Sequence, residues 1–330
     1  MNILKTIAFG AIAILMSVSC ASSQAWIADP YSRYNPEDYI CSVGYGDTME
    51  KAELKAKQEL ASLFGMEVRA SITRQITEAS GSGMETSHSD LFASDFTASV
   101  NLENLYGVKI IKRGPADKGF AALAVMEKKP TAENYLNEIK MLEKMLVAQK
   151  ILAGAADGTF AALHRAVQYM ETCRKYNTNL MIYSFLSADR LPLYDISDAH
   201  HRYQAAKNAI VLEVHVSGDD SGVVKSSASK LFTDAGFKVS HGTLTPTAKV
   251  EVTIAWQDFA GIGNPFQYAQ YNADVSVIDL AGNETVLVWN TADKEGHQTI
   301  EGARSRAVRR LCNDMEKEFT EELLKKYMIT

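Results

Sequence analysis

A few histidines are the residues in this chain whose type best suits metal binding. His200 and His201 are adjacent, and neighbouring residues on a helix point about 100° apart, so two such side chains rarely share one ion. His164 has no histidine or carboxylate four residues away on either side, the spacing that helical metal sites use. We therefore expect surface histidines, no metal site and no cofactor.

The four cysteines offer little redox or metal chemistry. None belongs to the C-x-x-C pair that zinc sites and thioredoxin-like centres use. Cys20 falls in an N-terminal targeting segment, and the remaining Cys41, Cys173 and Cys312 allow at most one internal disulfide. We expect Cys173 and Cys312 to be packed as apolar residues on helices.

Motifs for hydrolysis or phosphate binding are incomplete. The run Ser80-Gly81-Ser82-Gly83 lies in a polar stretch, whereas a serine hydrolase needs Gly-x-Ser-x-Gly at a strand-to-helix turn. Gly44-Tyr45-Gly46 lacks the third glycine and the lysine of a phosphate-binding loop. Asp219-Asp220 fits a helix start, and Glu321-Glu322 fits a solvated helix face. The chain is predicted not to be an enzyme; a hydrolase with dispersed acidic residues stays an alternative, because paired catalytic carboxylates can lie far apart in sequence.

The first twenty residues have the form of an export signal. Lys5 precedes an apolar run, 7–18, which is shorter than the roughly 20 residues of a membrane-spanning helix. Ser19-Cys20 resembles the end of a bacterial lipobox, although Ser17 stands where that pattern has leucine. We expect an anchor of acyl chains, such as palmitate, on Cys20, which ends a signal peptide over 1–20. The alternative is an ordinary cleaved signal peptide.

Composition agrees with a globular protein of more than one domain. The 330 residues suffice for two domains, and 46% of them are hydrophobic, enough for a sizeable core. The formal net charge is -6, and no basic, aromatic-rich patch occurs, so a nucleic-acid partner is not expected.

Residues 21–129 are predicted to form the first domain, an α+β domain whose helix and strands would position any site in this part of the chain. Apolar residues predict a strand over 40–45, and Asp47 with Glu50 predicts a capping box at the start of a helix that ends before Gly65. Alternation predicts a further strand over 66–73. A hairpin follows, with strands over 106–112 and 120–126.

Short motifs in this region resemble a known family. They are Trp26 with Pro30, Gly44-Tyr45-Gly46, the alanine-rich helix through Ala52, Ala56, Leu60 and Ala61, and the hairpin from Val108 through Gly119 to Val125. Together they resemble the Lpp-twenty family of bacterial lipoproteins, and the domain is similar to the N-terminal domain of flagellar assembly protein T. The resemblance implies a lipid-anchored envelope protein and supplies no active site.

The rest of the chain is predicted to form a connector and a second α+β domain. Residues 130–207 predict a helical hairpin connector, with helices over 131–153, 159–176 and 197–207. Residues 208–330 predict a mostly antiparallel sheet with two helices, the last over 299–327 with an apolar residue at every fourth position. The fold class is therefore α+β, with two domains that each pack helices on a sheet.

A Gly/Pro-rich segment in the second domain carries aromatic residues. Phe259, Phe266, Tyr268 and Tyr271 are the candidate partner-binding residues, since aromatic anchors dominate protein interfaces. The alternative is a wide hairpin turn whose aromatic rings fold back onto the sheet.

These features predict a structural or adaptor protein of the cell envelope. We expect it to be anchored to the outer membrane, on its periplasmic or surface face, by Cys20 and to bind another envelope or flagellar protein. The first alternative is a lipoprotein that binds a small molecule or glycan.

Overall fold

The computed structural model describes residues 25–80, 105–154, 156–189, 191–263 and 265–327, with side chains for all of these except 72–80. Cys20, His88 and the serine-rich run 80–83 beyond Ser80 lie outside this part. Two compact units divide the chain, Met1–Glu143 with Arg174–Tyr194, and Lys144–Cys173 with Asp195–Thr330. No helix in the described part combines the length and the apolar character that crossing a membrane requires.

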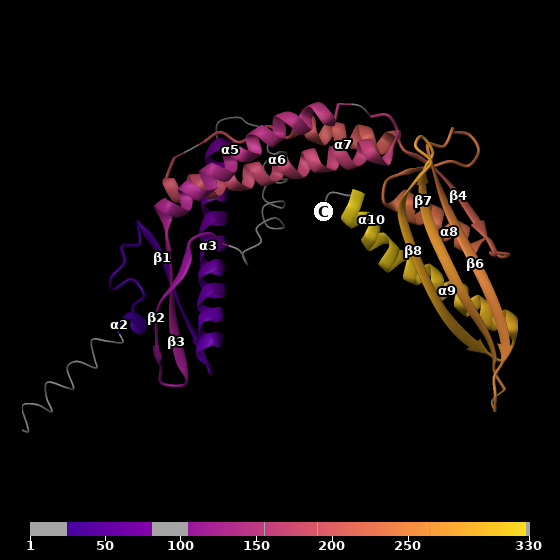
Figure 1. The fold of residues 1–330 in the computed structure, drawn as a ribbon, viewed down its shortest axis with the longest axis horizontal. Helices are drawn as coiled ribbons and strands as arrows, with labels where there is room; N and C mark the ends of the chain where they lie inside the picture. Colours follow the sequence, from indigo (N-terminus) through magenta and orange to yellow (C-terminus); the bar gives the residue numbers. More distant parts are fainter. Residues whose placement is uncertain (1–24, 81–104, 155, 190, 264, 328–330) are drawn as a thin grey trace, which may run out of the picture. The chain divides into compact units, whose positions relative to one another are not determined.

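The first unit is a three-stranded antiparallel sheet covered by one long helix (Figure 1). Its elements are α2 (Ala25–Ala28), β1 (Tyr39–Gly46), α3 (Met49–Ser80), β2 (Val108–Pro115) and β3 (Phe120–Glu127). The strand order is β1-β3-β2, so the expected hairpin of β2 and β3 is confirmed and β1 pairs with β3. Trp26 packs on the face of the sheet that carries Cys41 and Leu123.

The strand expected over 66–73 is wrong, because α3 continues through it. The alternation there is not matched by burial: Val68 is fully buried, whereas Met66 and Ala70 are exposed. Val68 instead continues the helical stripe of Leu60 and Phe64, one turn apart, in the same core. Gly65 lies inside the helix, which glycine tolerates at a cost of about 1 kcal/mol.

The start of α3 also differs from the capping box expected from Asp47 and Glu50. Thr48 is the cap, since its Oγ1 accepts a hydrogen bond from the backbone N–H of Lys51 at 3.3 Å. Asp47 instead accepts a hydrogen bond from the Lys51 ammonium at 2.8 Å. The helix begins one position later than expected because threonine can fill the same capping role as aspartate.

Three helices follow, α5 (Lys128–Leu152), α6 (Phe160–Ser187) and α7 (Ser197–Ala209). α6 extends beyond the predicted end at Tyr176, through the apolar run 180–186. Ala132, Tyr135, Met181, Ile182 and Leu186 complete the core of the first unit, while Phe160, Leu163, Val167 and Tyr203 join the core of the second. α6 therefore contributes residues to the cores of both units.

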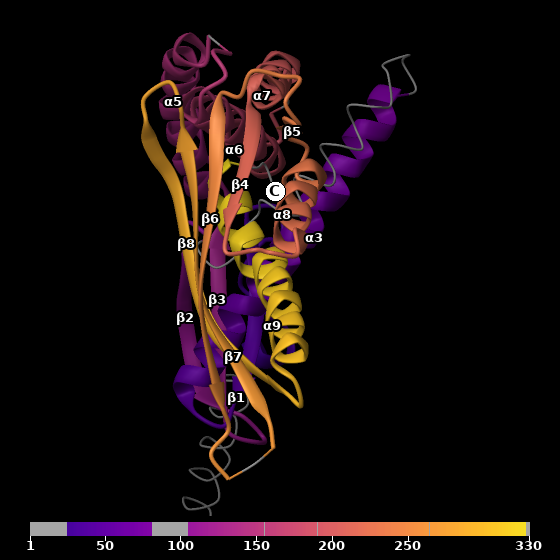
Figure 2. The same ribbon diagram turned by 90° about the vertical axis from the view of Figure 1, so that its right-hand side faces the viewer.

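The second unit is a five-stranded sheet with helices on one face (Figure 2). Its elements are β4 (Val211–Ser217), α8 (Val223–Asp234), β5 (Lys238–Val239), β6 (Ala248–Ala260), β7 (Gln267–Asp279), β8 (Glu284–His297), α9 (Ile300–Asp314) and α10 (Thr320–Tyr327). The order is β5-β4-β6-β7-β8, with parallel pairing around β4 and antiparallel pairing along β6, β7 and β8. The chain is an α+β protein, as expected.

The last helix contains a π turn that the sequence pattern did not predict. α9 and α10 are joined by the π-helical residues Met315–Phe319. The apolar stripe, with a residue at every fourth position, is buried along its whole length, from Ala303 to Tyr327.

Candidate functional site

The aromatic segment expected to be a loop is mostly strand. β6 extends to Ala260 and β7 begins at Gln267, so the connection is short, and it is closed by a hydrogen bond from the N–H of Gly261 to the carbonyl of Phe266 at 2.8 Å. Figure 2 shows this connection at the end of the sheet, beyond the first turn of α9. The strands extend because the antiparallel pairing of β6 with β7 continues without a break as far as Ala260 and Gln267.

Tyr271 does not belong to the exposed aromatic set. It is fully buried on the helix-covered face of β7, opposite Trp256 on β6, with the two ring centroids 6.0 Å apart. Its hydroxyl donates a hydrogen bond to Asp314 on α9 at 3.4 Å. Burial raises the pKa of Tyr271, and the nearby carboxylates raise it further. Tyr271 is a core residue that ties β7 to α9.

Phe259 and Tyr268 face the other, uncovered side of the sheet as a cross-strand pair. Their rings are stacked, with centroids 5.4 Å apart and planes 12° apart. Tyr268 also lies over Gly296 of β8, where an added Cβ would come within 2.7 Å of the ring. Glycine there leaves room for the ring to cover the strand, which stabilises the end of the sheet.

The hairpin tip beyond this pair is apolar and open to solvent. Ile262 is completely exposed, and Phe266 is 41% exposed beside Pro265. Phe259, 37% exposed, extends the apolar surface onto the strand. We call Phe259, Ile262, Pro265 and Phe266 the hairpin tip.

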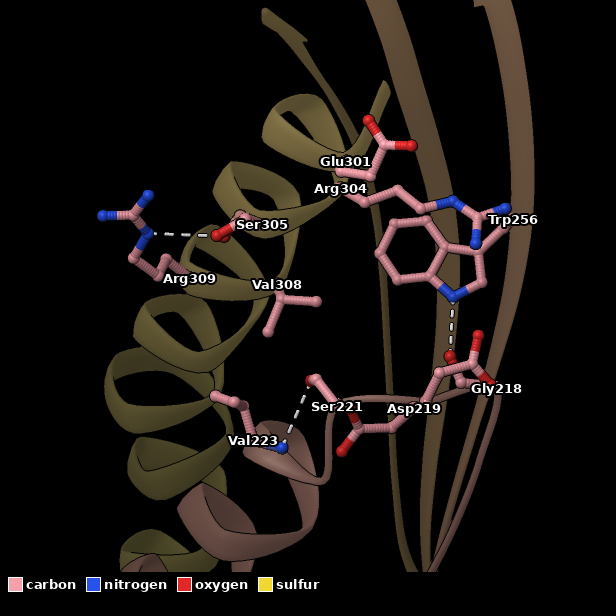
Figure 3. A pocket seen from close by; sticks show the side chains of 11 residues that line it. Gly218, Asp219, Ser221, Val223, Trp256, Glu301, Arg304, Ser305, Val308 and Arg309 are labelled. Atoms are coloured by element: carbon pink, nitrogen blue, oxygen red, sulfur yellow. Dashed lines mark hydrogen bonds between the residues drawn. The ribbon is translucent and has the colours of Figure 1, made fainter. Parts of the chain in front are cut away.

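A pocket of about 620 Å³ lies on the opposite, helix-covered face of the same strands (Figure 3). Its walls are the β4–α8 loop at Gly218 to Val223, the ring of Trp256, and α9 from Glu301 to Arg309. The indole N–H of Trp256 donates a hydrogen bond to the carbonyl of Gly218 at 2.7 Å, which fixes the ring against the loop. The volume is in the range of small-molecule pockets.

Arg304 closes one side of this pocket. Its guanidinium donates two hydrogen bonds to the carboxylate of Asp258. It also lies 5.6 Å from the ring centroid of Trp256, and Figure 3 shows the two side chains next to each other. The hydrogen bonds to Asp258 raise the pKa of Arg304. Trp256 and Asp258 reach the same wall because they are two residues apart on one strand.

The pocket rim carries both signs of charge. Burial raises the pKa of Asp219, but hydrogen bonds from the Ser221 hydroxyl and the N–H of Lys225 lower it by more, so the carboxylate is ionised. The Asp219 carboxylate therefore accepts its hydrogen bonds at the start of α8. Within the described residues, the carboxylates of Asp220 and Glu301 make no ion pair or hydrogen bond, and both raise the pKa of Arg304 through their negative charge. The rim could bind a cationic or zwitterionic group.

The histidines and cysteines considered from the sequence are not gathered into a site. His164 contacts Gln168 on its own helix, and His200 and His201 are exposed on α7. Among the described residues, no three histidine, cysteine or acidic side chains lie close enough to hold an ion. Cys41, Cys173 and Cys312 are all free thiols.

Sequence reasoning found the hairpin tip and missed the pocket. Apolar residues alternate over Val250, Val252, Ile254 and Trp256, so the apolar pattern stops at Trp256 and does not include Asp258, the next residue on the same face. Continuing the alternation by one step would have placed a carboxylate beside a tryptophan there. The pairing with Arg304, on an element 46 positions later, carried no local signal.

Comparisons with known proteins give partial likenesses to bacterial exported proteins. No protein-family model matches the chain, and no curated protein matches it. A secreted protein of Helicobacter pylori shares 11% identity over 85% of this chain and 98% of its own, with a TM-score of 0.45. A minor lipoprotein of Acinetobacter baumannii shares 12% over 34% of this chain and 91% of its own, with a TM-score of 0.25. A lipoprotein of Neisseria meningitidis shares 13% over 32% of this chain and 97% of its own, with a TM-score of 0.24. The family resemblance stays a prediction.

Proposed function

We propose that this protein is a non-catalytic adaptor of the bacterial cell envelope. Acyl chains on Cys20 hold it to the outer membrane, and the hairpin tip binds another envelope protein. The export signal supports this location in the cell envelope, because the signal ends in a cysteine preceded by a small residue. The flagellar apparatus is one setting for such a partner.

The exposure of Ile262 is the observation that carries this proposal. A fully exposed isoleucine, with two phenylalanines about two-fifths exposed beside it, leaves apolar surface in water at the end of a long hairpin. The stacked Phe259–Tyr268 pair supports the tip from the strands below. Large aromatic residues surrounded by a polar rim form the usual centre of a protein interface.

Site-specific photo-crosslinking in intact cells tests the proposal. A photoreactive amino acid at position 262 should give a discrete protein adduct, and the same amino acid at Leu280 should not. Leu280 is a matched control because it is 42% exposed and follows β7 at the opposite end of the strand. Absence of an adduct at position 262, together with a small molecule that copurifies tightly, would overturn the adaptor role.

The pocket favours one second candidate function, binding of a small molecule or glycan. Its volume of about 620 Å³, its tryptophan wall and its mixed charges at Arg304 and Asp220 suit a polar ligand with an apolar face. Native mass spectrometry of protein purified from its own membranes tests this. A ligand retained by the wild type and lost in Ser305→Trp, which fills the pocket, would support it.

A further inference from the structure

The edge of β1 in the first unit has backbone groups that no described residue pairs. β1 is the outer strand of its sheet, so only one of its sides contacts β3. The backbone N–H groups of Tyr39 and Cys41 point away from β3, to the Asn35 carbonyl and the Tyr31 hydroxyl. Alternate residues of a strand direct their N–H and C=O to the same side, so those of Val43 and Tyr45 also face outward. Within the described residues, these two have no partner on that side.

A groove of about 600 Å³ follows this edge. Its floor is β1 from Cys41 to Tyr45, and its walls are Pro30 with Tyr31 on one side and α3 on the other. α3 packs directly onto β1, because an added Cβ on Gly44 would lie 2.0 Å from the backbone nitrogen of Ala56. The side of α3 therefore borders the open edge from Lys55 to Leu63.

Three residues of α3 line the groove at regular spacing: Lys55, Glu59 and Leu63. Residues four apart on a helix are separated by about 6 Å along its axis, and same-face residues of a strand by about 6.7 Å. A strand lying beside β1 would thus place one side chain opposite each of the three. α3 runs antiparallel to β1, since Ala52 lies near Gly46 and Ala56 near Gly44.

Lys55 and Glu59 are exposed charges with no ion-pair partner among the described residues. Two other charges of α3 are paired, Lys51 with Asp47 and Glu53 with Arg113. Lys55 and Glu59 lie on the groove side of the helix, where an incoming chain can neutralise them.

We propose that this groove binds an extended segment of another polypeptide, which adds to β1 as a fourth, antiparallel strand. Its side chains facing α3 are acidic opposite Lys55, basic opposite Glu59 and apolar opposite Leu63, in that order at alternate positions. The outward N–H and C=O groups of Val43 and Tyr45 supply the main-chain hydrogen bonds. The inference goes beyond the adaptor proposal, because it concerns a different unit and holds whether or not the hairpin tip binds a protein.

A lone strand fits the groove more easily than a second copy of this chain. Symmetric antiparallel pairing of two β1 strands would place both α3 helices on one face of the joined sheet, and packed helices need 8–10 Å between their axes. A single strand brings no covering helix.

Fluorescence anisotropy with the full-length protein in detergent tests the proposal. The probe is a labelled peptide of eight residues with aspartate, lysine and leucine at its third, fifth and seventh positions and threonine elsewhere. The control peptide exchanges the aspartate and the lysine. We expect the first peptide to bind at least about fivefold more tightly than the control.

Charge reversal gives the decisive variant, because both residues are exposed and its fold should be unchanged. Lys55→Glu combined with Glu59→Lys should reverse the preference between the two peptides, and Ile262→Asp at the hairpin tip should leave it unchanged. Equal affinity of the wild type for both peptides, or no binding of either, overturns the proposal. Loss of binding in Val43→Pro, with an unchanged melting temperature, would further support the main-chain contact.

Discussion

The guanidinium of Arg304 holds the carboxylate of Asp258 through two hydrogen bonds, Nε to Oδ1 at 3.2 Å and Nη2 to Oδ2 at 2.7 Å. The same guanidinium lies over the ring of Trp256. This arrangement ties the first turns of α9 to the far end of β6, where the two-layer packing of the second unit ends. Bidentate pairing and ring contact both depend on the planar arginine group.

Replacing Arg304 should loosen this end of the unit. Arg304→Ala removes a partly exposed ion pair and a cation–π contact, so we expect the free energy of unfolding in urea to fall by about 1–2 kcal/mol. Arg304→Lys should recover less than half of this loss. Arg309→Ala is the matched control, because among the described residues the Arg309 side chain bonds only to the Ser305 carbonyl of its own helix. It should change stability by less than about 0.5 kcal/mol.

Tryptophan fluorescence gives an independent measure of the same change. Trp26 and Trp289 are 5% and 8% exposed, so they are shielded from acrylamide, whereas Trp256 is partly exposed. Quenching should therefore increase in Arg304→Ala and stay at the wild-type level in Arg309→Ala. Equal quenching in both variants would mean that Arg304 does not cover the ring.

Sequence patterns predicted most elements because burial follows periodicity, and they failed where two periods compete. Val68 fits a strand together with Met66 and Ala70, and it also fits a helix together with Leu60 and Phe64. Only its packing with Leu60 and Phe64 in the core decides between the two. The edge position of β1, and hence its groove, depends on strand pairing across most of the first unit. No local pattern reports such pairing.

The π turn in the last helix is explained by the four-residue spacing of its apolar residues. Four residues of an α-helix turn through about 400°, so a stripe with every fourth residue apolar drifts by about 40° at each step. From Ala303 to Tyr327 that drift would carry the stripe off the sheet. One extra residue in the turn at Met315–Phe319 offsets about 100° of it, which keeps Phe319 and Leu323 buried.

Gly44→Ala should disrupt the contact between β1 and α3. The new Cβ would lie 2.0 Å from the backbone nitrogen of Ala56, and a backbone atom cannot rotate away as a side chain can. We expect a loss of at least about 3 kcal/mol, at the upper end of overpacking effects, measured by urea unfolding. Gly114→Ala is the control, since its Cβ would meet only Trp26 at 3.7 Å. Similar stability of the two variants would contradict the close packing.

The buried thiols should be chemically inert in the folded protein. Burial raises the pKa of Cys41 to about 11 and that of Cys173 to about 12, so at pH 8 roughly one in a thousand Cys41 side chains is thiolate. Iodoacetamide at pH 8 should label both slowly in the native state and rapidly in urea, as followed by peptide mass spectrometry. Labelling should accelerate as pH rises toward these values. Fast native labelling of Cys41 would show that the β1 edge opens.

Cys20→Ser should release the protein from the membrane. Serine cannot form the thioether through which a cysteine carries its lipid, and each buried CH₂ of the lost acyl chains contributed about 0.8 kcal/mol to attachment. We expect the wild type in the carbonate-washed membrane fraction and Cys20→Ser in the soluble fraction of an immunoblot. Cys312→Ser is the matched control and should stay with the membrane, because this half-buried thiol lies in α9. Retention of Cys20→Ser after the carbonate wash would refute the lipid anchor and leave the adaptor proposal to depend on the hairpin tip alone.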